Sequence, residues 1–243
     1  MPAEDGSLDA LLGDLVIANR ILAREGVVDD FGHVSVRDPA DPGHFWLSCS
    51  RSPELVARED LLRFDLDAVP ENRGHRRPYI ESILHARIFA ARPDVNAVVH
   101  HHARAVLPFT ISSRKLRPVF HLGAVIGDEV PLWDSTPEFG DTCMLIDDAP
   151  KADSLARALR GNPTALLRSH GAVCVGGNLP QAVFVSIYMK ENAELQLQSE
   201  AGGHELRFLS PGEIRLTQAS QFSEGPMSRS WNYRRARAGF GGL

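Results

Sequence analysis

Three consecutive histidines, His100-His101-His102, follow an apolar segment that runs from Val95 to Val99. Side chains of a β-strand alternate between its two faces, so we expect His100 and His102 to point the same way and His101 to point the opposite way. Divalent metal ions accept neutral imidazole nitrogens at about 2.0–2.1 Å. The spacing therefore predicts half of a metal site.

Two ligands do not complete a coordination shell, so further donors are needed. His170 follows a second apolar segment, residues 164–167, and is the third candidate ligand. Glu81 lies upstream on a predicted helix and is the fourth group. A single histidine is more often a surface or core residue than a ligand, so the hypothesis depends on all four residues together.

The apolar pattern predicts the elements that would position these residues. Helices are expected at 8–22, from Pro78 to before Pro93, at 151–160, and from Pro180 onward; strands are expected at 34–36, 45–47, 61–66, 95–99, 165–168 and 172–175. The polar stretch 67–77 is expected to be an exposed loop. Helices interleaved with strands predict a layered α/β domain.

Composition limits the possible classes of protein. A chain of 243 residues, 43% of them hydrophobic, can bury one sizeable core, and we expect a single domain over 1–243. The net charge of −5 gives no broad basic field for nucleic acid. The basic segment 229–237 lies in a C-terminal tail, about 223–243, that we interpret as a lid or an interface.

The cellular location is expected to be cytoplasmic. Cys49, Cys143 and Cys174 are odd in number and far apart, which favours a reducing compartment. Residues 1–7 are acidic and do not form a secretory signal. No apolar run approaches the roughly 20 residues that span a bilayer, so no membrane partner is expected.

The segment 81–102 resembles the class II aldolase/adducin family. The similar residues are Glu81, His85, Ile88, Arg92-Pro93-Asp94-Val95, Val98-Val99-His100 and His102, followed by Ser169-His170-Gly171. The resemblance extends from the first helix to about residue 198. It implies a three-layer α/β/α fold with a central mixed sheet, in a homotetramer with active sites at subunit interfaces. It also implies that His100, His102 and His170 bind one divalent metal and that Glu81 is the acid/base.

The departures from the family pattern concern phosphate binding. Sugar-phosphate aldolases of this family bind phosphate at places that here read Gly32-His33, 48–52 and Tyr79-Ile80. A phenol and a branched alkyl group replace two small hydroxyl donors, so we do not expect a phosphorylated substrate. The tyrosine that donates a proton in those aldolases aligns with Leu122, beside His121.

The altered pocket resembles a subgroup that includes decarboxylases of hydroxylated aromatic or pyridine dicarboxylates. We therefore expect a metal-dependent carbon–carbon lyase that decarboxylates such a small-molecule acid with zinc, manganese, cobalt or iron. Glu81 or His121 would supply the proton that replaces carbon dioxide. Arg51 would clamp a second carboxylate, with His33, Ser50 and Tyr233 as further substrate-binding residues.

Other interpretations remain open for these residues and for the protein. Several residues have simpler interpretations. Arg51 can be a solvated loop charge and His85 a structural histidine. Trp231 and Tyr233 can be contacts to a neighbouring subunit. An aldolase for a non-phosphorylated hydroxy-carbonyl substrate and a non-haem iron oxygenase of a hydroxyphenyl acid would use the same metal. An adducin-like interaction protein would use only the surface of the fold.

Overall fold

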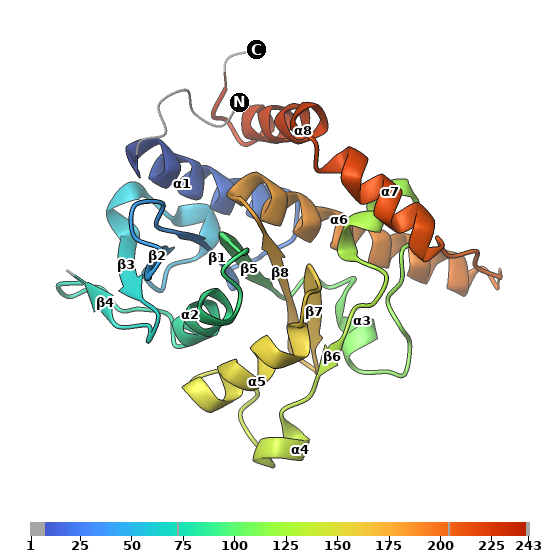
Figure 1. The fold of residues 1–243 in the computed structure, drawn as a ribbon, viewed down its shortest axis with the longest axis horizontal. Coiled ribbons are helices and arrows are strands. Elements are labelled where there is room, and N and C mark those ends of the chain that lie inside the picture. Colours follow the sequence, from blue (N-terminus) through green and yellow to red (C-terminus); the bar gives the residue numbers. More distant parts are fainter. Residues whose placement is uncertain (1–7, 72, 204, 242–243) are drawn as a thin grey trace.

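A computed structural model describes residues 8–71, 73–203 and 205–241 (Figure 1). Eight strands form one sheet in the order β4-β3-β2-β1-β5-β8-β7-β6. The strands are β1 (His33–Arg37), β2 (His44–Ser48), β3 (Leu61–Asp65), β4 (Pro70–Glu71), β5 (Ala97–His101), β6 (Leu132–Trp133), β7 (Thr164–Leu167) and β8 (Gly171–Gly176). Only β6 and β7 pair in parallel, so the sheet is mixed, as expected.

Helices cover both faces of this sheet. The helices are α1 (Leu8–Arg24), α2 (Ser82–Ala91), α3 (Leu107–Thr110), α4 (Thr136–Phe139), α5 (Ala149–Leu159), α6 (Leu179–Ala201), α7 (Pro211–Gln221) and α8 (Glu224–Arg237). Helices α1 and α6 pack together on one face, and α2 and α5 pack together on the other. The predicted three-layer α/β/α fold is confirmed.

The alternation of side chains along β5 divides the core into two parts. Ala97 and Val99 contribute to the core beneath α1 and α6. Val98, between them, contributes to the core beneath α2 and α5. The continuation of this alternation places His100 on the side of α2 and His101 on the side of α6.

Most of the predicted elements are confirmed, and two differ. Helix α2 begins at Ser82, so Pro78 lies outside it and Glu81 is its N-cap residue. Hydrogen bonds of Tyr79 with Arg51 and of Glu81 with the Ile146 amide hold the residues before Ser82 in a non-helical conformation. The expected loop 67–77 contains β4, which pairs with β3 through Glu71 and Pro70.

The C-terminal segment forms two helices that the apolar pattern did not predict. Helix α8 lies against α1 and α6 (Figure 1). Trp231 is buried there, and the guanidinium of Arg234 lies 2.7 Å from the Glu25 carboxylate. The described part of the tail, 223–241, therefore packs on the body of the domain.

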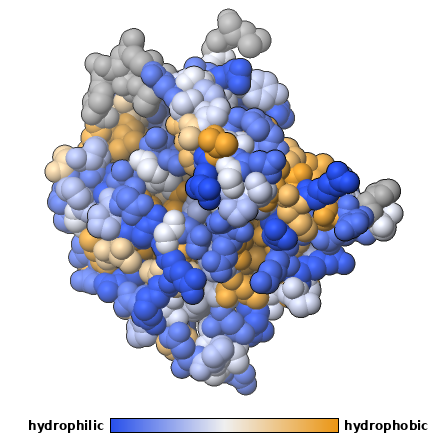
Figure 2. Space-filling view, turned by 45° about the vertical axis from the view of Figure 1, so that its right-hand side comes forward, coloured by the Kyte–Doolittle hydropathy of each residue, from blue (hydrophilic) through white to orange (hydrophobic). Residues whose placement is uncertain are grey.

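On the face drawn in Figure 2, apolar side chains reach the surface in separate areas among hydrophilic ones. None of the described helices is both long and apolar enough to cross a membrane.

Candidate metal and active site

His100 and His102 reach the site from the end of β5. This strand lies between β1 and β8, with His100 opposite His33 on one side and Val173 on the other. His100 is fully buried, and its Nδ1 donates a hydrogen bond to the Ala172 carbonyl over 3.1 Å. A carbonyl can only accept, so the lone pair of His100 lies on Nε2, which faces the site.

His170 reaches the same place from the tight connection between β7 and β8. The backbone of Ser169 has a φ of 55°, a left-handed conformation that is uncommon for a residue with a side chain. At Gly171, a Cβ atom would lie 2.3 Å from the His101 carbonyl oxygen, so only glycine fits. These two backbone features turn His170 toward the histidines of β5.

The three imidazoles converge as the sequence predicts. Their ring centroids are 4.8–5.0 Å apart, and the Nε2 atoms of His100 and His102 are separated by 3.0 Å. Two nitrogens bound tetrahedrally to one ion at about 2.1 Å would lie roughly 3.4 Å apart. A ligand atom from each ring lies within 4.8 Å of those of the other two, so small adjustments would suffice to hold a metal.

The chemistry of the donor set fits a metal ion. His170 Nε2 lies 3.8 Å from the Glu81 carboxylate, so this nitrogen is the one available to an ion. Three neutral nitrogen donors next to a carboxylate fit a divalent transition metal.

Glu81 projects from the N-terminus of α2 into the histidine cluster. Its carboxylate lies 3.6 Å from His100 and 3.8 Å from His170. The backbone amide of Ile146 donates to Glu81 Oε1 over 3.0 Å, which fixes the side chain.

The pKa of Glu81 lies below its ordinary value. Burial raises this pKa, but the neighbouring His33 imidazole, followed by that of His170, lowers it by more than burial raises it. The Ile146 amide acts in the same direction. Glu81 is therefore ionised near neutral pH and can accept a proton.

A second group of potential ligands overlaps the first. His33, Glu81 and His100 also bring their donor atoms within 4.8 Å of one another. His33 lies on β1, and its Nε2 is 3.8 Å from the Glu81 carboxylate. Its other nitrogen, Nδ1, is 2.7 Å from Nε2 of His85, one turn along α2 from Glu81.

His33, His102, His170 and Glu81 border a cleft of about 390 Å³, with His100 buried behind them. Its apolar lining comes from Phe31, Ile80 and Leu145, and the first two are 65% and 67% exposed. Its polar lining includes Ser50, Arg51, Tyr79, Glu81, His33, His102 and His170. A cleft of this size and mixed lining suits a small polar ring compound.

The loop that carries Arg51 is tied to the segment before α2. The Tyr79 hydroxyl donates to the Arg51 carbonyl and accepts from the Arg51 amide. The guanidinium Nε of Arg51 lies 3.4 Å from Asp60, while its side chain remains 48% exposed. Tyr79 thus has a structural role in shaping the rim, which its sequence position did not reveal.

Two of the predicted site residues do not line this cleft. His121 begins a 3-10 helix, is exposed, and lies 3.3 Å from the Gln221 side chain of α7. Tyr233 on α8 is 58% exposed and stacks with Arg237. Within one chain, the structure brings together His33, Ser50, Arg51 and Glu81 with the three metal-ligand candidates, without His121 and Tyr233.

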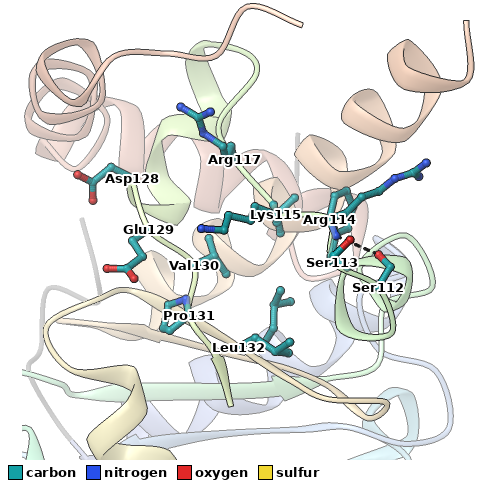
Figure 3. A pocket seen from close by; sticks show the side chains of 13 residues that line it. Ser112, Ser113, Arg114, Lys115, Arg117, Asp128, Glu129, Val130, Pro131 and Leu132 are labelled. Carbon is teal, nitrogen blue, oxygen red and sulfur yellow. Dashed lines mark hydrogen bonds between the residues drawn. The ribbon is translucent and has the colours of Figure 1, made fainter. Parts of the chain in front are cut away.

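A larger cavity of about 560 Å³ lies elsewhere, between the segments 112–117 and 128–132 (Figure 3). Arg114, Lys115 and Arg117 lie on one side of it, and Asp128 and Glu129 on the other. It is lined by no histidine or cysteine. The chemistry described here belongs to the smaller cleft.

Sequence reasoning did not assign site roles to Ser35, Asp60 or the Ile146 backbone. Ser35 could have been found, because it lies two residues after His33 and shares that face of β1. No pattern marks Asp60 or Ile146, since both act through contacts between distant loops.

One protein family and several known proteins are similar to this chain. A family model described as the class II aldolase and adducin N-terminal domain matches residues 13–197. Decarboxylase tropJ of Talaromyces stipitatus is 34% identical over 238 residues, which cover 87% of this chain and 87% of that protein. A 3,4-dihydroxyphthalate decarboxylase of Arthrobacter keyseri is 28% identical, and the aligned region covers 82% of this chain and 83% of that protein.

Two further similarities concern another activity and the fold. A 4-hydroxy-3-prenylphenylpyruvate oxygenase/4-hydroxy-3-prenylbenzoate synthase of Streptomyces roseochromogenus is 31% identical, with 77% of this chain and 67% of that protein covered. The solved L-fuculose 1-phosphate aldolase from Glaciozyma antarctica superposes with a TM-score of 0.80 at 22% identity, covering 98% of this chain and 93% of that one. The last similarity concerns the fold alone.

Proposed function

Because this chain belongs to the class II aldolase and adducin family, we propose that it is a metal-dependent lyase that decarboxylates a hydroxylated aromatic or heteroaromatic carboxylic acid. One observation carries the proposal: three imidazoles and an ionised carboxylate meet at a small cleft with apolar walls. Similarity to two proteins named as decarboxylases supports this reaction over others that the same metal site allows.

His100, His102 and His170 would hold one divalent ion, either zinc, manganese, cobalt or iron. When bound, the metal supplies a Lewis acid that stabilises negative charge on adjacent substrate oxygens. Three histidines leave room in the coordination shell for those oxygens.

Glu81 is proposed to move the proton. Its low pKa keeps it ionised, so it can accept the proton of a substrate hydroxyl next to the carboxylate that leaves. As the carbon–carbon bond breaks and carbon dioxide departs, the electron pair remains on the ring carbon. Glu81 then returns the proton to that carbon, and the hydroxyl oxygen regains one from solvent.

The rim of the cleft is proposed to orient the acid. Phe31, Ile80 and Leu145 would contact the faces of a flat ring. Arg51 can reach a second carboxylate, since its contact with Asp60 uses Nε and no described residue binds its terminal amino groups. Ser50 and His33 line the same cleft and would bind the remaining polar groups.

The assembly is proposed to be a homotetramer with active sites at subunit interfaces. Phe31 and Ile80 are largely exposed beside the cleft, which suits coverage by another copy. His121 and Tyr233 lie outside the cleft of their own chain, so a role for either in catalysis or binding would require a neighbouring subunit. Sedimentation analysis of the purified protein tests this assembly.

The reaction is tested with metal-loaded protein and a panel of hydroxyphthalic and hydroxypyridine dicarboxylic acids under nitrogen. We expect release of carbon dioxide and formation of the acid with one carboxyl group fewer. His100→Ala should abolish turnover and metal binding, whereas His75→Ala, which changes an exposed histidine of the loop before α2, should retain both. Absence of turnover with every acid of the panel argues against decarboxylation.

An oxygenase is the second candidate, favoured by the 31% identity to a protein named as one. Iron-loaded protein would then consume dioxygen and act only in air. Formation of an aldehyde by cleavage under nitrogen would instead indicate an aldolase. The same panel, assayed with and without oxygen, separates the three reactions.

A further inference from the structure

Three buried side chains form a hydrogen-bonded chain that ends at the candidate metal site. Ser35 Oγ lies 2.6 Å from His85 Nδ1, and His85 Nε2 lies 2.7 Å from His33 Nδ1. The other nitrogen of His33, Nε2, faces the Glu81 carboxylate at 3.8 Å. Ser35 and His85 are fully buried and His33 is 4% exposed, so solvent does not substitute for these contacts.

The direction of this chain follows from its two ends. His85 Nδ1 is the one hydrogen-bond partner of the Ser35 hydroxyl among the described residues, so the hydroxyl is satisfied as a donor only if it donates there. A neutral His85 then carries its proton on Nε2 and donates to His33 Nδ1. A neutral His33 in turn carries its proton on Nε2.

The opposite direction is unfavourable at both ends. Ser35 would accept from His85, and its own buried proton would have no acceptor. His33 would present a lone pair to the Glu81 carboxylate, and two acceptors would face each other at 3.8 Å. The low pKa of His85, caused chiefly by its complete burial, agrees with the neutral ring that either direction requires.

We propose that Ser35 and His85 lock His33 in the tautomer with its proton on Nε2, and that this lock keeps His33 out of the metal coordination shell. The second half of this statement rests on the proposed metal site. A ring nitrogen that carries a proton has no lone pair for a metal. Of the two overlapping groups of donors, the lock therefore excludes the one that contains His33 and leaves His100, His102 and His170.

The lock also gives Glu81 a fixed partner. The proton on His33 Nε2 points toward the carboxylate and stabilises its ionised form. Because the chain ends at a buried serine, it does not carry protons to solvent. His85 and Ser35 are therefore positioning residues, and they act on Glu81 and on the metal only through His33.

The tautomer is measured directly by long-range ¹H–¹⁵N correlation spectra of the full-length protein labelled at histidine, first metal-free and then loaded with zinc. The signals of His33 are assigned by their loss in His33→Asn. We expect His33 to show a protonated Nε2 and an unprotonated Nδ1 in both forms. A proton on Nδ1 in the metal-free protein, or loss of the Nε2 proton on addition of zinc, overturns the proposal.

Two substitutions of Ser35 distinguish the effect of its hydroxyl donor from the effect of its packing. Ser35→Ala removes the donor and should give mixed tautomers of His33, together with a changed visible spectrum of the cobalt-loaded protein as His33 joins the ion. Ser35→Thr keeps the donor and should retain the native tautomer and spectrum. Ser186→Ala, which removes another buried hydroxyl that donates within α6, is the matched control and should change neither.

These measurements use no substrate, so they are independent of which reaction the protein catalyses. An unchanged tautomer in Ser35→Ala, or equal losses in Ser35→Ala and Ser35→Thr, overturns the lock and leaves decarboxylation standing. Conversely, a panel of acids without turnover removes the proposed reaction and leaves the tautomer lock intact.

Discussion

Glu81 Oε1 accepts a hydrogen bond from the backbone amide of Ile146, 65 residues later in the chain. The 3.0 Å contact joins the N-terminus of α2 to the loop before α5. It engages Oε1 of the carboxylate, whereas His33 lies nearest to Oε2. Because the donor is a backbone amide, this contact does not depend on the side chain of residue 146.

Glu81→Gln tests the proton transfer. The amide oxygen can still accept from Ile146, so the side chain should keep its position while losing the ability to accept a proton. We expect kcat to fall by roughly 10²–10⁴-fold, the usual contribution of a general acid–base residue, with metal content unchanged. Steady-state kinetics and metal analysis of the same preparation check this. Activity within tenfold of the unmodified protein would show that another group moves the proton.

His170→Ala tests whether the third ligand comes from the β7–β8 turn. The native protein should gain thermal stability on addition of zinc, by about 2.7 kcal/mol when the free metal is 100 times its dissociation constant. His170→Ala should fold and lose most of this gain, because two imidazoles remain. Thermal melts with and without zinc measure the difference, and His75→Ala is the control. An equal zinc response in both variants would place the metal elsewhere.

The sequence predicted the convergence of His100, His102 and His170 for a physical reason. A strand period of two fixes His100 and His102 on one side whatever surrounds them. His170 followed from its place after a second strand, although the left-handed Ser169 that turns it inward left no mark in the sequence. Strands β7 and β8 were equally predictable, since their buried residues form largely apolar runs.

The remaining parts depend on contacts that sequence spacing does not encode. Glu81 was expected within a helix, yet it is the N-cap residue of α2, because Tyr79 is bound to the distant Arg51 loop and Glu81 to the Ile146 amide. Helix α8 lacks a clear apolar stripe and is attached through Trp231 and the ion pair of Arg234 with Glu25. His121 and Tyr233 had suitable chemistry, but residue type alone does not place a side chain in a cleft.

Gly32→Ala and Gly13→Ala should have opposite effects on stability. Gly32 has a φ of 96°, and a Cβ there would lie 2.8 Å from Val28 and 3.0 Å from the His100 carbonyl. Gly13 lies in α1, where a Cβ would meet nothing within 4 Å. We expect Gly32→Ala to destabilise the protein. Gly13→Ala should stabilise the protein by up to about 1 kcal/mol. Urea unfolding measures both, and destabilisation of similar size in both variants would contradict the structure.

The metal-free protein should lose stability as pH falls below about 6.5. Burial lowers the pKa of His101 to about 3, and it also lowers the pKa values of His85 and His100 well below the ordinary value. Between these lowered pKa values and about pH 6.5, the unfolded chain therefore binds more protons than the folded one. The free energy of unfolding consequently rises with pH in this range. Each such histidine contributes a slope of up to about 1.4 kcal/mol per pH unit.

Urea unfolding in the presence of a chelator at several pH values measures this slope. His101→Leu removes one of the histidines with a lowered pKa and should reduce the slope by up to one proton. A slope that is the same in His101→Leu and in the native protein would mean that His101 is not held neutral by the fold.

Arg51→Gln should change substrate preference more than catalysis. Arg51 lies at the rim of the cleft, where its contact with Asp60 orients the guanidinium. A hydrogen bond to a charged group contributes about 1.5–3 kcal/mol, so KM for a dicarboxylic acid should rise roughly 10–150-fold. The KM for a related acid with a single carboxylate should change little, since that carboxylate leaves as carbon dioxide. Kinetics with the paired acids distinguish this effect from general damage, and Arg157→Gln, which changes an exposed arginine of α5, is the control. Equal rises in KM for both acids would mean that Arg51 binds the leaving carboxylate or shapes the loop, and would remove the reason for expecting a substrate with two carboxylates.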